Sequence, residues 1–443
     1  MFGDGFLWGV AAAAYQIEGA ADEDGRGPSV WDTFCAEPGR IAGGDTGAVA
    51  CDHYHRHAED VALMRDLGVD SYRFSVSWPR VLPDGGKQVN RAGLDFYDRL
   101  VDELVAAGIQ PACTLYHWDL PQALQDQGGW LNRDTAHRLA DYATVVAERL
   151  ADRVSMWMPL NEPMVVTLLG HAMGVHAPGQ TLGLGALPVA HHQLLGHGLA
   201  VRALRAAGAT NIGIANNHAP IWPATDGPAD LAAAELADGL VNRVFADSIL
   251  LGAYPEPFGA ALPGPVADDL EIIAEPLDWY GINHYNPMRV AAPSPDDPQA
   301  SVAGFGMVPI TEYPLTDFGW PVVPDALREL LVEFHERYGD ALPPVYVTEN
   351  GASFADGPDA DGRVADTRRI DYLDGYLGAV AAAIESGVDV RGYFLWSVMD
   401  NFEWAEGYGQ RFGLVHVDFD TQKRTPKDSF GWYRDMIARH SRA

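Results

Sequence analysis

Residues 91–120 read RAGLDFYDRLVDELVAAGIQPACTLYHWDL, and this stretch contains the structural unit that repeats along the chain. Between residues 94 and 105, leucine and valine recur at three- and four-residue spacing, which is typical of the buried face of an α-helix. Gly108 can end such a helix in the left-handed conformation, and the apolar run of residues 110–116 follows directly. The stretch therefore predicts a helix that leads back into a buried strand.

Short apolar runs and longer segments of helical period alternate in this way along the sequence, which is typical of βα units around a parallel sheet. The predicted strands cover residues 7–13, 71–77, 110–116, 155–160, 211–216, 279–283, 345–348 and 392–397. The predicted helices cover residues 57–67, 91–107, 134–152, 188–207, 230–250, 324–338, 366–386 and 426–439. The count approaches eight of each, which predicts an α/β fold: a single (β/α)8 TIM barrel over residues 1–443, with extended βα loops.

The region from residue 286 to about residue 313 is the least regular part of this pattern. It contains Pro287, Pro293, Pro295 and Pro298, which we expect to prevent a regular strand ladder or helix. A loop of this length within a compact domain is usually functional, and we expect it on the rim of the face that holds the site. Proline and glycine between residues 255 and 265 would permit a domain break, but an ordinary barrel loop is favoured.

The composition excludes several classes of partner. The chain has 30 Lys and Arg against 61 Asp and Glu, and its formal charge of −31 would repel nucleic acid and anionic lipid. No run of about 18 apolar residues predicts a membrane span. The apolar residues 6–15 are read as a buried strand and not as a signal peptide, because Asp4 precedes them and Gln16 follows. The 3 cysteines show no CxxC spacing, which favours a reducing, cytoplasmic compartment.

Polar and aromatic residues gather where the predicted strands end. They are Gln16 after the first strand, Arg73 in the second, His117 and Trp118 after the third, Asn161 and Glu162 after the fourth, Asn283 and Tyr285 after the sixth, Glu349 after the seventh, and Trp396, Glu403 and Trp404 at the eighth. Any one of them has an ordinary explanation as a core or loop residue. Because the carboxyl ends of barrel strands converge on one face, their joint placement predicts a site.

The residue types at these strand ends suit a sugar. Tryptophan faces match the C–H surfaces of a pyranose, and the polar side chains among them would bind its hydroxyl groups. Cleavage of a glycosidic bond requires one carboxylic acid and one carboxylate on opposite sides of the reacting carbon, and Glu162 and Glu349 are candidates for both. A carbohydrate-binding protein without activity would keep the tryptophans and lose a carboxylate, whereas transfer of the sugar to another alcohol would use the same residues.

The sequence resembles glycoside hydrolase family 1, the β-glucosidase family, in seven phrases that follow one another along almost the whole chain. They are FLWGVAAAAYQIEGA at residues 6–20, DHYHRHAEDVALMRDLGVDSYRFSVSWPR at 52–80, TLYHWDLPQAL at 114–124, LNEP at 160–163, YGINHY at 280–285, VTENG at 347–351 and FLWSVMDNFEW at 394–404. LNEP alone would be a weak signal, but the seven phrases together are highly specific.

This resemblance implies a retaining β-glycosidase, with the barrel as its single catalytic domain and no cofactor or metal. It implies that Glu162 is the acid/base, that Glu349 is the nucleophile and that Arg73 and Tyr285 contact Glu349. It further implies a set of residues that hold or border the terminal sugar: Gln16, His117, Trp118, Asn161, Glu403, Trp404 and Phe412, to which the strand-end pattern adds Asn283 and Trp396. Retention requires the two carboxyl groups to lie about 5 to 5.5 Å apart.

The expected substrate is a small β-glycoside or oligosaccharide without phosphate, because a carboxylate at Glu403 would repel a 6-phosphate. Met164 stands after LNEP where the family often has tryptophan, so the preference for the leaving group is open. The choice among glucose, galactose and fucose and the oligomeric state are open as well. Neither the histidines at 53, 55 and 57 nor the glycines at 183 and 185 have the surroundings of a metal or nucleotide site.

Overall fold

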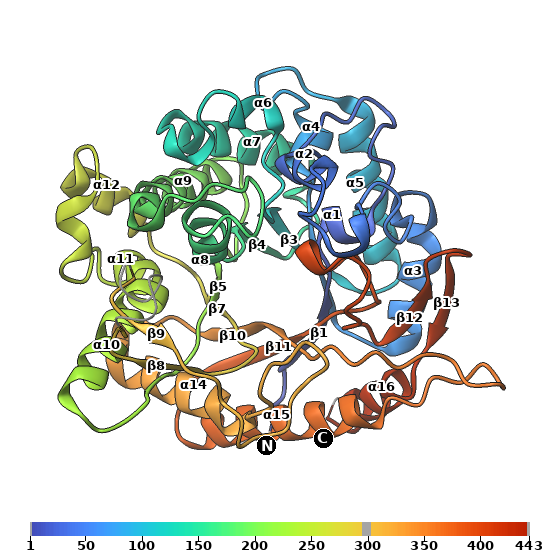
Figure 1. The fold of residues 1–443 in the computed structure, drawn as a ribbon. Coiled ribbons are helices and arrows are strands. Elements are labelled where there is room, and N and C mark those ends of the chain that lie inside the picture. Colours follow the sequence, from blue (N-terminus) through green and yellow to red (C-terminus); the bar gives the residue numbers. More distant parts are fainter. Residues whose placement is uncertain (1, 295–302, 441–443) are drawn as a thin grey trace.

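The computed structural model describes residues 2–294 and 303–440, and its centre is a ring of parallel strands (Figure 1). One 8-stranded sheet has the order β4-β3-β2-β1-β11-β10-β7-β5. Isolated parallel bridges from Trp157 to Ile212 and from Asn161 to Ala215 connect β4 with β5 and close the ring. The strands are β1 Leu7–Ala11, β2 Ser71–Ser75, β3 Gln110–Tyr116, β4 Met156–Leu160, β5 Ala215–Asn217, β7 Tyr280–Asn283, β10 Val345–Asn350 and β11 Val390–Trp396. The predicted (β/α)8 barrel is confirmed.

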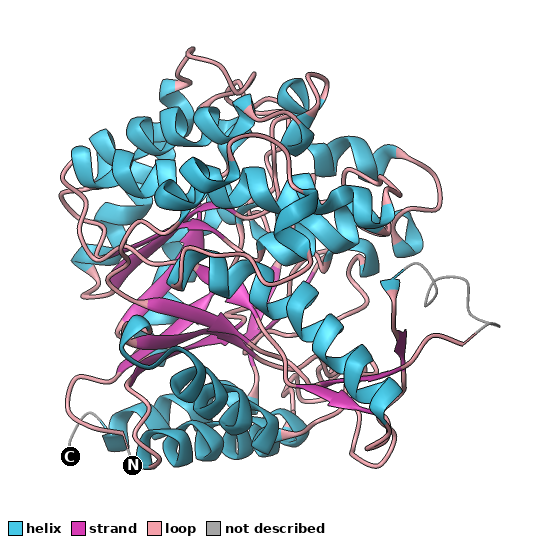
Figure 2. Cartoon of the chain, turned by 90° about the vertical axis from the view of Figure 1, so that its left-hand side faces the viewer, coloured by secondary structure: helices cyan, strands magenta, loops and turns pink. Residues whose placement is uncertain are grey.

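The main helices form a layer outside these strands (Figure 2). They are α3 His53–Leu67, α5 Arg91–Ala106, α7 Asp134–Leu150, α9 Leu187–Ala206, α10 Pro228–Asp238, α11 Val244–Leu250, α14 Pro324–Tyr338, α15 Thr367–Glu385 and α16 Asp428–His440. The prediction of one helix over residues 230–250 is corrected, because the π-helix η5 Gly239–Arg243 separates α10 from α11. No helix of the described residues is long and apolar enough to cross a bilayer.

Short elements occupy the connections between strands and long helices. The α-helical ones are α1 Ala14–Ile17, α2 Val30–Ala36, α4 Trp78–Val81, α6 Gln122–Gln125, α8 Pro163–Val165 and α12 Val266–Ile273. The others are the 3-10 or π turns η1 Ala42–Gly44, η2 Gly129–Leu131, η3 Val166–Ala172, η4 Gly183–Ala186, η6 Phe258–Ala261, η7 Gly339–Ala341 and η8 Trp404–Glu406. Because α1 and α4 begin soon after β1 and β2, these strands are shorter than the predicted runs to Ala13 and Ser77.

The region after residue 286 contains a small ladder, so the expectation that prolines prevent one is wrong in part. Strand β8 Met288–Ala291 pairs in parallel with β6 Ile221–Pro223 and antiparallel with β9 Gly306–Met307. Pro287 and Pro293 flank β8 and do not interrupt it, whereas Pro295 and Pro298 lie outside the described residues. A second unpredicted hairpin, β12 Val415–Asp418 and β13 Lys423–Pro426, precedes α16.

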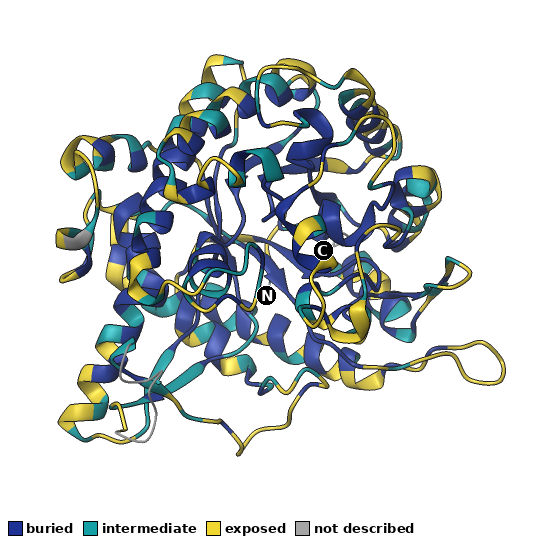
Figure 3. Ribbon diagram, turned by 45° about the horizontal axis from the view of Figure 1, so that its top comes forward, coloured by how far each residue is buried: buried dark blue, intermediate teal, exposed yellow. Residues whose placement is uncertain are grey.

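The core fills both the barrel and the space between the strands and the helices (Figure 3). Every residue of β2 and β4 is buried, as expected for parallel strands that are covered on both faces. The outer layer is packed closely at Gly198 of α9, where an added Cβ would lie 1.9 Å from the carbonyl oxygen of Ile272 in α12. Helix α12 can therefore approach α9 only because residue 198 has no side chain.

We expect Gly198→Ala to lower the free energy of unfolding by about 1–3 kcal/mol, because α12 must shift to accept the methyl group. The matched control is Gly378→Ala in α15, where an added Cβ meets nothing within 4 Å. That change should stabilise the protein by up to about 1 kcal/mol, since alanine is the better helix former. Denaturant unfolding of both variants checks the packing, and a Gly198→Ala protein as stable as the control would contradict it.

Candidate active site

A cavity of about 420 Å³ opens at the carboxyl ends of the barrel strands. Many of the predicted residues line it: His117, Trp118, Glu162, Tyr285, Glu349, Trp396, Glu403, Trp404 and Phe412. The remaining predicted residues, Gln16, Arg73, Asn161 and Asn283, are buried next to this lining and hydrogen bond to it. The strand-end pattern therefore points to residues that the fold brings to one place.

Backbone geometry aims the first of the two glutamates into the cavity. Glu162 lies two residues after the end of β4 and takes a left-handed conformation, with φ of 46°, before Pro163 starts α8. Its N–H donates to the carbonyl oxygen of Ala215 at 2.8 Å, which ties this turn to β5. Trp118 and Trp404 also have positive φ values, of 76° and 48°. Such conformations are uncommon for residues with side chains and are often found at functional sites.

Glu349, within β10, is held by one cation and one hydroxyl group. The Arg73 guanidinium donates from Nη1 to Oε1 at 2.5 Å, and the Tyr285 hydroxyl donates to Oε2 at 2.7 Å. Arg73 is only 1% exposed, so water screens this ion pair poorly. Burial and the charge of Glu349 raise the pKa of Tyr285 well above its ordinary value, so Tyr285 remains a donor. Both contacts implied by the family resemblance are present.

Glu162 has neutral partners instead. Asn283 and Asn217 donate from Nδ2 to Oε1 of Glu162 at 2.7 and 3.1 Å. Burial, and then the negative charge of Glu349, raise the pKa of Glu162 to about 8. The two amides do not offset these effects, because they supply no positive charge. Glu162 is therefore mainly protonated at neutral pH.

A hydrogen-bonded chain links the two glutamates through Asn161. Its Oδ1 accepts from Arg73 Nη2 at 2.6 Å and from Asn283 Nδ2 at 3.0 Å, which fixes the orientation of the amide. Asn161 Nδ2 must then donate to His117 Nε2, which lies 3.0 Å away, so the proton of this imidazole is on Nδ1. Burial and the nearby charge of Arg73 hold the pKa of His117 well below its ordinary value. His117 is a neutral hydrogen-bonding group.

The end of the cavity at His117, Glu403 and Trp404, next to Gln16, combines polar groups with aromatic faces. Gln16 donates from Nε2 to the Phe402 carbonyl oxygen at 2.9 Å and to Glu403 Oε2 at 3.3 Å, while its Oε1 has no partner among the described residues. Burial and the charges of the other glutamates raise the pKa of Glu403 to about 8. Trp404 stacks on the His117 ring with centroids 6.0 Å apart. These are the two kinds of surface that a pyranose requires.

Several lining residues were not predicted from the sequence. Asn217 stands at the end of β5 and directly follows the predicted strand 211–216, so the strand-end rule covers it, but no residue was singled out at the end of the fifth predicted strand. Phe318 and Trp320 stack with centroids 4.2 Å apart at the cavity wall, beside Phe412. They lie on a long connection before α14, where no strand end marks them.

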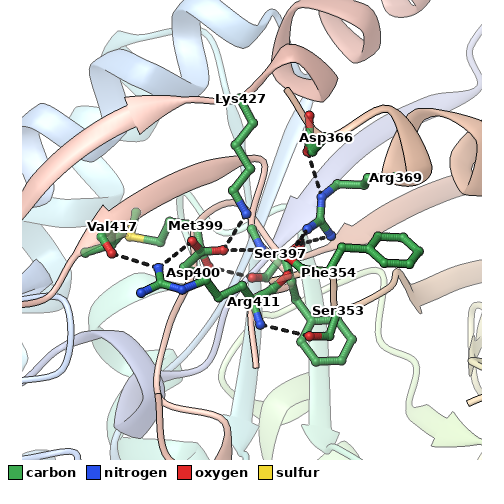
Figure 4. A network of polar contacts seen from close by, with 12 residues as sticks. Ser353, Phe354, Asp366, Arg369, Ser397, Met399, Asp400, Arg411, Val417 and Lys427 are labelled. Carbon is green, nitrogen blue, oxygen red and sulfur yellow. Dashed lines mark hydrogen bonds and ion pairs between the residues drawn. The ribbon is translucent and has the colours of Figure 1, made fainter. Parts of the chain in front are cut away.

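A buried ionic network supports the loops behind the cavity (Figure 4). Asp400 accepts from Lys427 Nζ at 2.7 Å and from Arg411 Nη1 at 2.9 Å. Burial alone would raise the pKa of Asp400, but the two cations outweigh it and hold the pKa below its ordinary value. Arg369 donates to the carbonyl oxygens of Ala352 and Phe412. The network thus connects the segments that follow β10 and β11, including Phe412 at the cavity wall.

The histidines outside the cavity that lie beside acidic residues are engaged in local contacts. His53 Nδ1 lies 2.8 Å from Asp60, which also accepts from Arg424. His191 Nε2 lies 3.0 Å from Asp269, which is paired with Arg133. Over the described residues, no three His, Cys, Asp or Glu side chains are grouped in a way that could hold a metal ion.

Comparison with known proteins identifies full-length relatives. A family model described as glycosyl hydrolase family 1 matches residues 1–442. The chain is 47% identical to beta-glucosidase A of Acetivibrio thermocellus over 98% of this chain and 97% of that protein, and 48% identical to a beta-glucosidase of Agrobacterium sp. over 98% and 94%. A solved beta-glucosidase from Thermotoga maritima, in complex with glucoimidazole, superposes with a TM-score of 0.94 at 45% identity and covers 99% of both chains.

We expect Asp400→Asn to lower the free energy of unfolding by about 3–5 kcal/mol, because it leaves the buried Lys427 and the half-buried Arg411 without their counter-ion. The control is Asp389→Asn, which removes the partner of Arg391 in an exposed pair and should change stability by less than about 1 kcal/mol. Denaturant unfolding of both proteins measures the difference. Equal effects would show that the network in Figure 4 does not stabilise the loops around the site.

Proposed function

The chain belongs to glycosyl hydrolase family 1, and from this premise we propose that it is a retaining β-glucosidase that cleaves terminal, unphosphorylated β-D-glucosides. The observation that carries the proposal is the unequal environment of two glutamates in one cavity. Glu349 is paired with a buried guanidinium, whereas Glu162 has only amide donors and a pKa raised to about 8. One carboxylate is thereby suited to attack and one carboxylic acid to protonate.

In the first half of the reaction, the Glu349 carboxylate attacks the anomeric carbon while Glu162 transfers its proton to the glycosidic oxygen. The bond from carbon to that oxygen breaks, the alcohol leaves, and the sugar becomes an ester of Glu349. Tyr285 and Arg73 orient the attacking carboxylate through the hydrogen bonds to its two oxygens. The positions of these two donors fix the direction from which the carboxylate attacks the anomeric carbon.

In the second half, Glu162 acts as a base. Esterification removes the negative charge of Glu349, which is one of the two causes of the raised pKa of Glu162, so this pKa falls. The ionised Glu162 then takes a proton from water, the water oxygen attacks the anomeric carbon, and Glu349 is released as a carboxylate. The sugar leaves with the β configuration it had in the substrate.

The end of the cavity at His117, Glu403 and Trp404 is the proposed site of the terminal sugar. Gln16, His117, Asn161 and Glu403 supply its hydrogen bonds, Trp118, Trp396 and Trp404 supply aromatic faces, Asn283 positions Glu162, and Phe412 borders the ring. The relatives' names and the glucoimidazole complex support glucose as this sugar. Among the described residues, the cavity lining includes Glu403 and Glu406 but no Lys or Arg, so a 6-phosphate would find no cation there, which supports an unphosphorylated substrate.

We expect Glu349→Ala to abolish hydrolysis and added azide to restore turnover of an activated aryl β-glucoside. Azide can occupy the space of the missing carboxylate and attack from the same face, which inverts the anomeric carbon once. The product should therefore be the α-glucosyl azide, identified by NMR. A β-glucosyl azide would assign the nucleophile to another residue.

We expect kcat/KM for a glucoside with a poor leaving group to fall above about pH 8, where Glu162 loses the proton that it must donate. Glu162→Ala should strongly lower kcat/KM for this glucoside. It should change kcat/KM much less for a dinitrophenyl β-glucoside, whose leaving group needs no protonation. In the variant, the decline of kcat/KM near pH 8 should be absent. If it persists, it belongs to Glu403, whose pKa is also raised to about 8, and the acid role of Glu162 is contradicted.

A further inference from the structure

We propose that the leaving-group half of the cavity selects an apolar aglycone, an alkyl chain or aromatic ring, in preference to a second sugar. This inference rests on the proposed function, because the position of the leaving group follows from the role of Glu162 as proton donor. The leaving oxygen must lie beside Glu162, so the side chains around that residue form the surface that the aglycone meets.

The wall beside Glu162 is built largely from apolar side chains. Met164 and Val165 of α8 and Leu169 of η3 come from the segment that follows Glu162 directly, and all three line the cavity. Ala219, after β5, and Met288, in β8, continue this lining. Methionine is flexible and polarizable, so Met164 and Met288 can adapt to ligands of different shape.

Two polar side chains of this wall already make hydrogen bonds within the protein. Asn217 donates from Nδ2 to Glu162, and Asn286 donates from Nδ2 to the carbonyl oxygen of Pro287 at 2.9 Å. At the sugar end, by contrast, Gln16 keeps a buried Oε1 without a partner among the described residues. A second pyranose would need several hydrogen bonds on the outer wall to offset the loss of its hydration, whereas an apolar group needs none.

His176 offers one further polar contact at the cavity wall. Its ring packs on Trp31 and Trp118 at centroid distances of 5.4 and 5.8 Å, and burial lowers its pKa to about 4, so it is neutral. Nδ1 is buried without a partner among the described residues. A single neutral imidazole suits a substituent on an aromatic ring better than the several hydroxyl groups of a sugar.

The apolar surface also continues outward from the cavity. Val175 lines the cavity and is nevertheless 47% exposed, and Met173, Leu182 and Leu184 on the same connection are exposed as well. Exposed apolar residues that adjoin a binding cavity commonly belong to a recognition surface. A long alkyl chain attached to the sugar could extend from Met164 past Val175 and remove both from water.

The test is a series of n-alkyl β-D-glucosides, from methyl to octyl, together with cellobiose. The alkyl leaving groups have similar acidity, so kcat/KM reports how well the wall binds the chain in the transition state. We expect kcat/KM to rise by about two- to fourfold per methylene over the first several carbons, and hexyl glucoside to exceed cellobiose. A flat series, or cellobiose above octyl glucoside, would overturn the inference. If the protein hydrolyses none of these glucosides, the proposed function fails instead.

Variants of two methionines test whether the wall beside Glu162 causes the dependence of kcat/KM on chain length. Met164→Gln keeps the length of the side chain and adds polarity, so it should lower kcat/KM for octyl glucoside by about five- to tenfold and leave methyl glucoside within twofold. The control is Met307→Gln on β9. Met307 is 58% exposed and does not line the cavity, so this change should leave kcat/KM for both glucosides unaltered. Equal losses on methyl and octyl glucoside in Met164→Gln would contradict the proposed selectivity of this wall.

Discussion

The buried guanidinium of Arg73 is the interaction on which the rest of the site depends. It stands in β2 at the centre of the barrel, where water cannot solvate it, so its charge requires protein partners. Those partners are Glu349, the Asn161 amide and the Thr114 hydroxyl, on three different strands or strand ends. Because Arg73 is paired with Glu349 and not with Glu162, the two glutamates differ in their electrostatic surroundings. This difference separates the proposed nucleophile from the proposed acid, although both residues have the same side chain.

Much of the fold could be predicted from the sequence, because burial on both faces makes barrel strands apolar and the helices around them amphipathic. The helix predicted over residues 91–107 and the strand predicted over residues 110–116 agree with α5 and β3 to within one residue. The predictions failed where tertiary contacts decide the outcome. Strand β5 has only 3 residues, and Asn211, the first residue of the predicted strand, takes a left-handed conformation instead. The break between α10 and α11 is a π-helix, and the apolar period of residues 230–250 passes through it without a signal.

The strand-end rule located the site, yet it could not assign roles by physics alone. It placed Glu162 and Glu349 on one face of the barrel, but which of them pairs with Arg73 depends on side-chain geometry that no local pattern encodes. Asn217 directly follows the predicted strand 211–216, yet no residue was singled out at that strand end. Phe318 and Trp320 were missed because they lie on a loop that no strand end marks. The assignment of nucleophile and acid came from resemblance, and the contacts of each carboxyl group now supply a physical reason for it.

One cavity therefore has a polar, aromatic end for a sugar, an apolar wall for what is attached to it, and two carboxyl groups between them. The central claim is that Glu349 attacks the anomeric carbon directly and that water replaces it afterwards. The most direct measurement is proton NMR of the sugar that forms first from an aryl β-glucoside, before mutarotation mixes the anomers. Two successive inversions predict β-glucose as the initial product. An initial α anomer would mean a single displacement by water, and it would contradict the account of both glutamates.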